Sequence, residues 1–251
     1  GLAGSGAGII TGLLCTRLRI NASLAGVLVS TGFYSITLVI LGGGTLSLAD
    51  ASSVMTGAGK LGQMLGLPAL FDLMGTTVTA EGVVTVFVMA ALALFLTVAL
   101  IVFLRTNLGL AVRASGGNPN MARALGVNVD HMLILGLGLA NGLVGISGAL
   151  EAQFLGYANV QMGVGAVVTG LATLLIGEAL MGKRPLWRWV GSALVGAVVY
   201  RSLVAAAVRA GLNANALRLL TALMVLVVLL LPRLKRFLPR KKAGEEAAEY
   251  A

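Results

Sequence analysis

The sequence is poor in charge, histidine and cysteine, and these shortages exclude several classes of protein. Asp, Glu, Lys and Arg make up 11% of its 251 residues, whereas about a quarter of a soluble domain is charged. Cys15 is the only cysteine, which leaves no disulfide framework and no cysteine-based zinc site. His131 is the only histidine and has no second ligand at metal-binding spacing. We therefore expect no resident metal or cofactor, and too few groups for general-base catalysis by the chain itself.

Apolar residues and a surplus of cations dominate the composition instead. Hydrophobic residues make up 58% of the chain, the mean hydropathy is +0.97 and the formal net charge is +9. A nucleic-acid-binding surface would gather its cations in a basic patch with aromatic residues for base stacking. Here the cations form short clusters between apolar runs, and aromatic residues make up only 5% of the chain. The sequence therefore predicts a protein surrounded by lipid, with no nucleic-acid partner.

Long apolar runs recur along the chain and predict an all-α fold, a polytopic transmembrane helix bundle. About 20 helical residues cross the hydrocarbon core of a bilayer, and the strands of a membrane barrel would alternate apolar and polar residues, which these runs do not. We expect one transmembrane domain over residues 1–232 and a polar cytoplasmic tail at 233–251. Seven spans are expected, at 2–14, 20–41, 82–104, 132–150, 163–180, 186–208 and 216–231. Because the first run is short and begins at Gly1, we expect the natural N-terminus to lie further upstream.

The positions of Lys and Arg predict which loops face the cytoplasm, because cytoplasmic loops retain these residues. They cluster at 17–19, 105–123, 183–188 and 233–242, and the alternation of the expected spans places all four clusters on one side. We therefore expect loop 105–130 and the C-terminus to be cytoplasmic. Loop 42–81 is expected on the opposite side of the membrane.

The chain contains 35 glycines, some of which recur at four-residue spacing. Gly4, Gly8 and Gly12 share one helix face, and so do Gly138 and Gly142. Small residues at this spacing let membrane helices approach closely, so we expect tight helix packing there. The pattern does not distinguish a channel, a secondary transporter and a permease, since all three pack in this way.

Loop 105–130 is predicted to contain a short helix of its own. Asn118 is a favourable N-cap, Pro119 suits the first helical position, and Gly126 can adopt the left-handed conformation that ends a helix. The predicted helix therefore runs from residue 119 to residue 125.

This short helix would present an apolar knob with a basic flank. Met121 and Leu125 are four residues apart and share one face, whereas Arg123 points elsewhere. The residues alone leave two interpretations open: the helix docks against a cytoplasmic partner, or it rests on lipid.

Residues 113–130 read RASGGNPNMARALGVNVD, and this stretch resembles the cytoplasmic loop of permeases of ATP-binding-cassette (ABC) importers of the branched-chain amino acid and ribose type. Residues 16–42, 134–180 and 195–232 resemble one subgroup, sometimes linked to the uptake of aromatic amino acids. The resemblance implies a permease for a small polar solute, with amino acids among the candidates. It also implies a loop that couples the permease to an ATPase. The residues it assigns to this loop are Arg113, Ser115, Gly116, Asn118, Met121, Ala122, Arg123, Leu125 and Gly126.

The resemblance further implies a complex in the bacterial plasma (inner) membrane. The expected partners are a second permease copy or a paralogue, two cytoplasmic ATPase subunits, an extracytoplasmic substrate-binding protein and membrane lipid. The chain has no phosphate-binding loop of its own, because Gly59 and Lys60 lack the Ser or Thr that follows in that motif. ATP hydrolysis would therefore come from the partner subunits. The alternative is a secondary transporter or a channel, but ion coupling favours several mid-membrane carboxylates, and the spans offer only Glu151 and Glu178.

Polar residues in or near the expected spans are candidates for the substrate path, because polar groups at that depth usually face a cavity or another helix. Arg201 either borders the path or is structural, by reaching toward the membrane surface or pairing with Glu151. Asn141 either borders the path or hydrogen-bonds to a neighbouring helix. The candidates are Asn141, Glu151, Gln153, Tyr157, Asn159, Gln161 and Arg201.

The predicted orientation can be tested by thiol labelling in a Cys15→Ser background. Cysteine in place of Lys60 should react with an impermeant thiol reagent on intact cells, because loop 42–81 is expected outside. Cysteine in place of Ser115 should not react, and labelling at that position would overturn the predicted topology.

Overall fold

The structure is a computed structural model, and it describes residues 1–48, 57, 70–73, 76–163, 165–182 and 185–211. The expected span at 216–231 and the tail at 233–251 lie outside the described residues, as do Lys60, Lys183 and Arg184. The chain divides into two compact units, residues 1–163 and residues 164–251. Each unit is described by itself.

Helices make up most of the described residues of both units and confirm the all-α fold. The first unit contains α1 (Leu2–Thr16), α2 (Ala22–Leu41), α4 (Ala80–Arg105), α5 (Asn107–Gly117), α6 (Pro119–Ala124), α7 (Val129–Leu155) and the short 3-10 helix η1 (Val160–Gly163). The second contains α8 (Ala166–Met181) and α9 (Leu186–Arg209). Within the described residues, five stretches are long and apolar enough to cross a membrane: Ala22–Leu41, Gly82–Arg105, Val129–Leu155, Val160–Met181 and Leu186–Arg209. The helix at the first expected span is also apolar but has only 15 residues.

Helix ends in the first unit are set by side-chain caps and left-handed glycines. Asn21 caps α2, its side chain accepting the N–H of Ser23 at 3.0 Å. Helix α2 ends at Gly42 and α7 ends at Gly156, with φ of 62° and 73°, a conformation that glycine adopts without steric cost. The chain therefore turns sharply at both ends, and each turn leads into a short strand.

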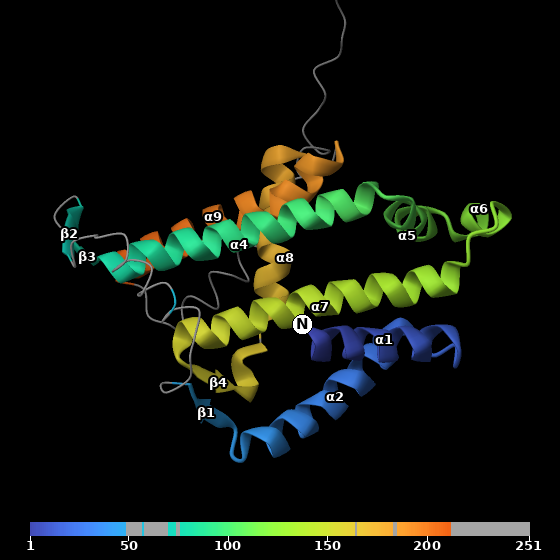
Figure 1. The fold of residues 1–251 in the computed structure, drawn as a ribbon, viewed down its shortest axis with the longest axis horizontal. Coiled ribbons are helices and arrows are strands. Elements are labelled where there is room, and N and C mark those ends of the chain that lie inside the picture. The colour runs from blue at the N-terminus through green and yellow to red at the C-terminus, as the bar shows by residue number, and fades with distance from the viewer. Residues whose placement is uncertain (49–56, 58–69, 74–75, 164, 183–184, 212–251) are drawn as a thin grey trace, which may run out of the picture. The chain divides into compact units, whose positions relative to one another are not determined.

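The glycine repeat of α1 packs directly against α7, and the two helices lie side by side (Figure 1). A methyl group on Gly4 would overlap the backbone carbonyl of Asn141, and one on Gly8 would overlap the carbonyl of Leu137. Only glycine allows this approach, as expected for membrane helices that associate through small residues. The predicted tight packing is confirmed. The glycines that line the contact are Gly1, Gly4, Gly8, Gly12, Gly138, Gly142 and Gly145.

A second close contact joins α8 to α9, and we did not predict it. A methyl group on Gly177 would overlap the carbonyl of Ser192, and one on Gly196 would overlap the carbonyl of Thr173. Ser192 is completely buried between the helices. The signal was present in the sequence, since each helix carries two small residues four positions apart at this contact.

Side chains extend this α8–α9 contact toward both ends of the pair. Ala172, Ile176 and Tyr200 form its buried apolar cluster. Nearer the turn between the helices, the indole N–H of Trp189 donates a hydrogen bond to a carboxylate oxygen of Glu178 at 2.8 Å. Glu178 thus joins α8 to the start of α9.

Four short strands complete the described structure. Strand β1 (Thr45–Ser47) pairs antiparallel with β4 (Tyr157–Asn159), so the segment after α2 is joined to the segment after α7 (Figure 1). Strands β2 (Leu70–Leu73) and β3 (Thr76–Thr79) form an antiparallel pair just before α4. None of the four strands was predicted.

The α8–α9 contact predicts that a single methyl group at Gly196 destabilises the protein. Gly196→Ala should lower the melting temperature in detergent, because overpacking a close contact costs about 1–3 kcal/mol. Gly191→Ala is the matched control on the same helix, since nothing lies within 4 Å of the added carbon there. Thermal unfolding followed by size-exclusion chromatography measures both variants, and equal melting temperatures would contradict the packing.

Candidate functional site

Loop 105–130 contains two helices, α5 and α6, whereas the sequence predicted one short helix. Helix α5 begins after Thr106, whose hydroxyl accepts the N–H of Gly109 at 3.2 Å and donates to the carbonyl of Phe103 at 2.6 Å. A methyl group on Gly109 would overlap that same carbonyl. The prediction missed α5, although a Thr N-cap followed by eleven residues without proline is a recognisable helix start. The elbow between α4 and α5 is thereby tightly fixed.

Helix α6 forms as its sequence signals predict. The side chain of Asn118 accepts the N–H of Met121 at 3.1 Å, and Pro119 occupies the first helical position. Gly126 has a φ of 80° and follows the helix end. The helix ends at Ala124, one residue before the predicted end.

The apolar face formed by Met121 on α6 and by Leu125, the residue that follows its end, is exposed. Met121 is 62% exposed and Leu125 is 70% exposed, whereas Ala122 is buried at 1%. Ala122 therefore anchors the helix against the rest of the loop, and the two large apolar side chains project outward. The apolar knob predicted from the sequence is present.

An ion pair links α6 to the start of α7. A guanidinium nitrogen of Arg123 lies 3.6 Å from a carboxylate oxygen of Asp130, and both side chains are mostly exposed. Asn128 caps α7 by accepting the N–H of His131 at 3.2 Å. The basic flank of the knob is thus paired within the chain, and an exposed pair of this kind contributes about 0–1 kcal/mol.

The remaining loop candidates differ in exposure. Arg113 and Gly116 are exposed, whereas Ser115 is only 7% exposed and its hydroxyl has no hydrogen-bond partner among the described residues. A buried side chain is hidden from both a docking partner and a labelling reagent. Ser115 is therefore an uninformative labelling position, and the exposed Asn120 replaces it.

Two of the substrate-path candidates after α7, Asn159 and Gln161, line a small polar pocket at the β1–β4 pair. Asn159 is central to it: its side-chain N–H donates to the hydroxyl of Thr45 at 2.7 Å, and its side-chain oxygen accepts the backbone N–H of Gln161 at 2.7 Å. The pocket is partly open and has a volume of about 280 Å³. Its lining residues are Tyr34, Leu38, Gly43, Gly44, Thr45, Asn159, Val160 and Gln161.

Other path candidates of the first unit lie outside this lining. Tyr157 is 42% exposed and pairs with Ser47 in the strand register. Glu151 is exposed and Gln153 is half-buried, both near the end of α7. Asn141 donates to the carbonyl of Leu137 in its own helix at 3.0 Å, so this hydrogen bond does not reach the neighbouring helix as one alternative expected.

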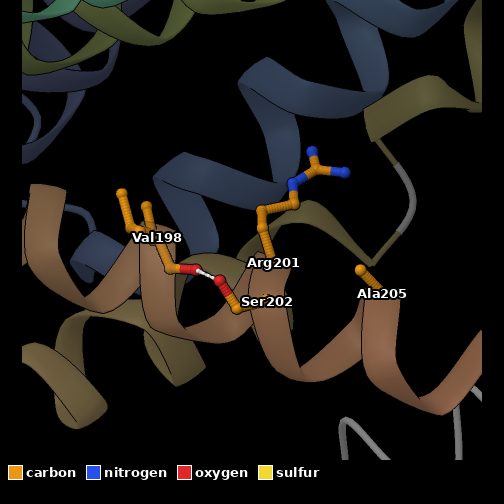
Figure 2. Close-up of a pocket in the computed structure, with 5 residues that line it drawn as sticks. Val198, Arg201, Ser202 and Ala205 are labelled. Atoms are coloured by element: carbon orange, nitrogen blue, oxygen red, sulfur yellow. Dashed lines mark hydrogen bonds between the residues drawn. The ribbon is translucent and has the colours of Figure 1, made fainter. Parts of the chain in front are cut away.

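Arg201 lies on α9 in the second unit, beside a shallow depression of about 460 Å³. Figure 2 shows its side chain extending from the helix and away from the Ser202 hydroxyl. The hydroxyl of Ser202 donates to the carbonyl of Val198 at 2.9 Å and so is used within the helix. Ala197 and Ala205 lie one turn before and one turn after Arg201, and their small side chains leave the cation accessible. Its place on the substrate path stays a prediction.

Comparison with known proteins identifies the family. Residues 1–230 match the family described as the permease component of the branched-chain amino acid transport system. The chain belongs to this family. It is a multi-pass membrane permease of the ABC transporter class, which confirms the resemblance noted from residues 113–130.

Curated relatives place the permease among transporters of several solutes. It is 31% identical to a tyrosine transport system permease protein of Clostridioides difficile, over 91% of this chain and 69% of the relative. It is 26% identical to a ribose import permease protein of Escherichia coli, over 78% of this chain and 55% of the relative. It is 28% identical to an autoinducer 2 import system permease protein of Yersinia enterocolitica, over 70% of this chain and 43% of the relative. The chain thus spans about half the length of the last two. No solved structure matches it significantly.

Burial in the loop predicts a contrast between two cysteine variants in a Cys15→Ser background. Cysteine at Asn120 should react with an impermeant thiol reagent in inside-out vesicles but not on intact cells. Cysteine at Ser115 should not react on intact cells and should react only slowly in inside-out vesicles, because the side chain is buried. Reaction of position 120 on intact cells would contradict the cytoplasmic assignment of the loop, and rapid reaction of position 115 would contradict its burial.

Proposed function

We propose that this permease is the membrane-spanning subunit of an ATP-driven importer for a small polar solute. The observation that carries the proposal is the exposed apolar face of α6, where Met121 and Leu125 project from a helix held by caps at both ends. When a partner covers two large apolar side chains, the free energy of the complex falls by about 25 cal/mol per Å² of buried apolar area. Cytoplasmic ATPase subunits are the proposed partner.

The contacts around α6 support a coupling role, because they lead to two membrane helices. Helix α5 packs against both α6 and α7, and the Thr106 elbow joins α5 to α4. The Arg123–Asp130 pair joins α6 to the start of α7. A displacement of α6 by an ATPase would therefore act through α5, on α4 by way of the elbow and on α7 by way of the contact between α5 and α7.

The proposed complex contains two permease subunits, either two copies of this chain or one copy and a paralogue. Two ATPase subunits bind on the cytoplasmic side, and an extracytoplasmic binding protein delivers the solute. The complex lies in the bacterial inner membrane, with the C-terminus of the permease in the cytoplasm. Relatives named for tyrosine and ribose support an amino acid or a sugar as the solute.

A secondary transporter or a channel is the rival function, and family membership speaks against it. The carboxylates also offer little for ion coupling, which favours several acidic groups at mid-membrane. Glu178 accepts the indole N–H of Trp189 near the end of α8, and Glu151 is exposed near the end of α7.

The proposal predicts that a negative charge on the apolar face of α6 uncouples transport. Met121→Asp and Leu125→Asp should each greatly weaken ATPase binding, because burying an unpaired charge in an interface costs several kcal/mol. Arg123→Ala should have a small effect, since its ion pair with Asp130 is exposed. Co-purification with the ATPase encoded beside the permease, and ATP-driven uptake in liposomes, measure both steps.

Asn120→Asp is the matched control for these variants. It adds the same charge to the first turn of α6, where a carboxylate is favourable, but about 100° around the helix from Met121. It should retain the ATPase and transport. If the variants at 121 and 125 also retain both, the exposed face of α6 is not the coupling surface.

A further inference from the structure

The polar pocket of the first unit contains hydrogen-bonding groups that the fold itself does not use. The hydroxyl of Tyr34 and the side-chain amide of Gln161 make no hydrogen bond with any described residue. The Thr45 hydroxyl accepts from Asn159 and keeps its own O–H, and Asn159 keeps a second side-chain N–H. The pocket therefore offers both donors and acceptors to a small molecule.

The chemistry of the lining favours uncharged groups. None of the eight lining residues is charged, and six of them present a polar side chain or bare glycine backbone. An ionised group that left water for this pocket would lose its solvation without meeting an opposite charge in the lining. Neutral hydroxyl groups, which both donate and accept, match the lining better.

The backbone holds the pocket in shape before any ligand arrives. The β1–β4 pair sets Thr45 opposite Asn159, and the N–H of Val160 donates to the carbonyl of Gly44 at 3.2 Å. Gly44 has a φ of 87°, which other residues rarely adopt. A preformed site reduces the ordering cost of binding. Its volume of about 280 Å³ lies at the small end of ligand sites and suits a small solute.

We propose that the polar pocket binds the neutral hydroxyl groups of the imported solute, with Tyr34 and Gln161 as the side chains that contact it. The proposal rests on the proposed function and adds the chemistry that the permease recognises. The pocket lies beyond the ends of α2 and α7 that are predicted to face outward, so it is placed to receive solute on entry. The hydroxyl can belong to a sugar or to the phenol of tyrosine.

Direct binding of three probes to the permease–ATPase complex in nanodiscs tests this proposal without the binding protein. The probes are radiolabelled D-ribose, L-tyrosine and L-phenylalanine, the last lacking only the phenolic hydroxyl of tyrosine. At least one hydroxylated probe should bind about tenfold or more tightly than phenylalanine. Binding of ribose identifies a sugar site and binding of tyrosine an amino acid site, and both results support the proposal.

Two variants test whether the solute hydroxyl is bound in this pocket. Tyr34→Phe and Gln161→Leu should each weaken binding of the hydroxylated probe about threefold to tenfold, the effect of losing one neutral hydrogen bond. Ser30→Ala is the control on α2, because its hydroxyl donates to the carbonyl of Val27 and is not in the lining. None of these three side chains takes part in the hydrogen bond between the side chains of Asn159 and Thr45.

Three results would overturn the proposal. The first is equal binding of tyrosine and phenylalanine without binding of ribose, and the second is wild-type binding by both pocket variants. The third is unchanged solute binding together with lost stimulation of ATP hydrolysis by the binding protein, which would make the pocket a protein-docking surface. Failure of the proposed function has a different signature, since the wild-type complex would then show no ATP-driven uptake.

Discussion

The close approach of helix backbones at glycine is the interaction on which the described structure depends. Lipid removes the hydrophobic drive that joins helices in water, so membrane helices associate through close packing and hydrogen bonds. Gly4 and Gly8 bring α1 onto the backbone of α7, and Gly177 and Gly196 bring α8 onto α9. Much of the remaining helix surface consists of large, exposed apolar side chains, as expected for a surface that faces lipid. Because these positions are glycine and carry no side-chain carbon, the helices of each unit can pack this closely.

Helix α7 connects the two candidate sites of the first unit. Its first turn follows α6 and receives the Arg123–Asp130 pair, and its last turn leads through Gly156 into β4 and the polar pocket. Between these ends the helix is braced by α1. The same element therefore carries the proposed ATPase surface at one end and the proposed solute pocket at the other, so the two sites share one rigid support.

Features that depend on neighbours in the sequence could be predicted, and those that depend on distant segments could not. Asn118 and Gly126 bound α6 as expected, because capping involves residues only a few positions apart. The bond from Asn159 to Thr45 joins residues 114 positions apart, and strands of three residues leave no periodic pattern to find. The burial of Ser115 follows from the packing of α5, a helix that the prediction missed. The family's loop motif was recognisable, whereas the orientation of its side chains required the fold.

Because α7 is long, a small tilt at one of its ends produces a large displacement at the other. Its 27 residues form a rod about 40 Å long. A tilt of about 5° around one end moves the other end by about 3.5 Å, which exceeds the length of a hydrogen bond. The bond between Asn159 and Thr45, at 2.7 Å, joins the segment after the far end of this rod to β1, the strand that follows α2. A small rotation of α7, together with the α1 that packs against it, is therefore large enough to separate the two strands at its tip.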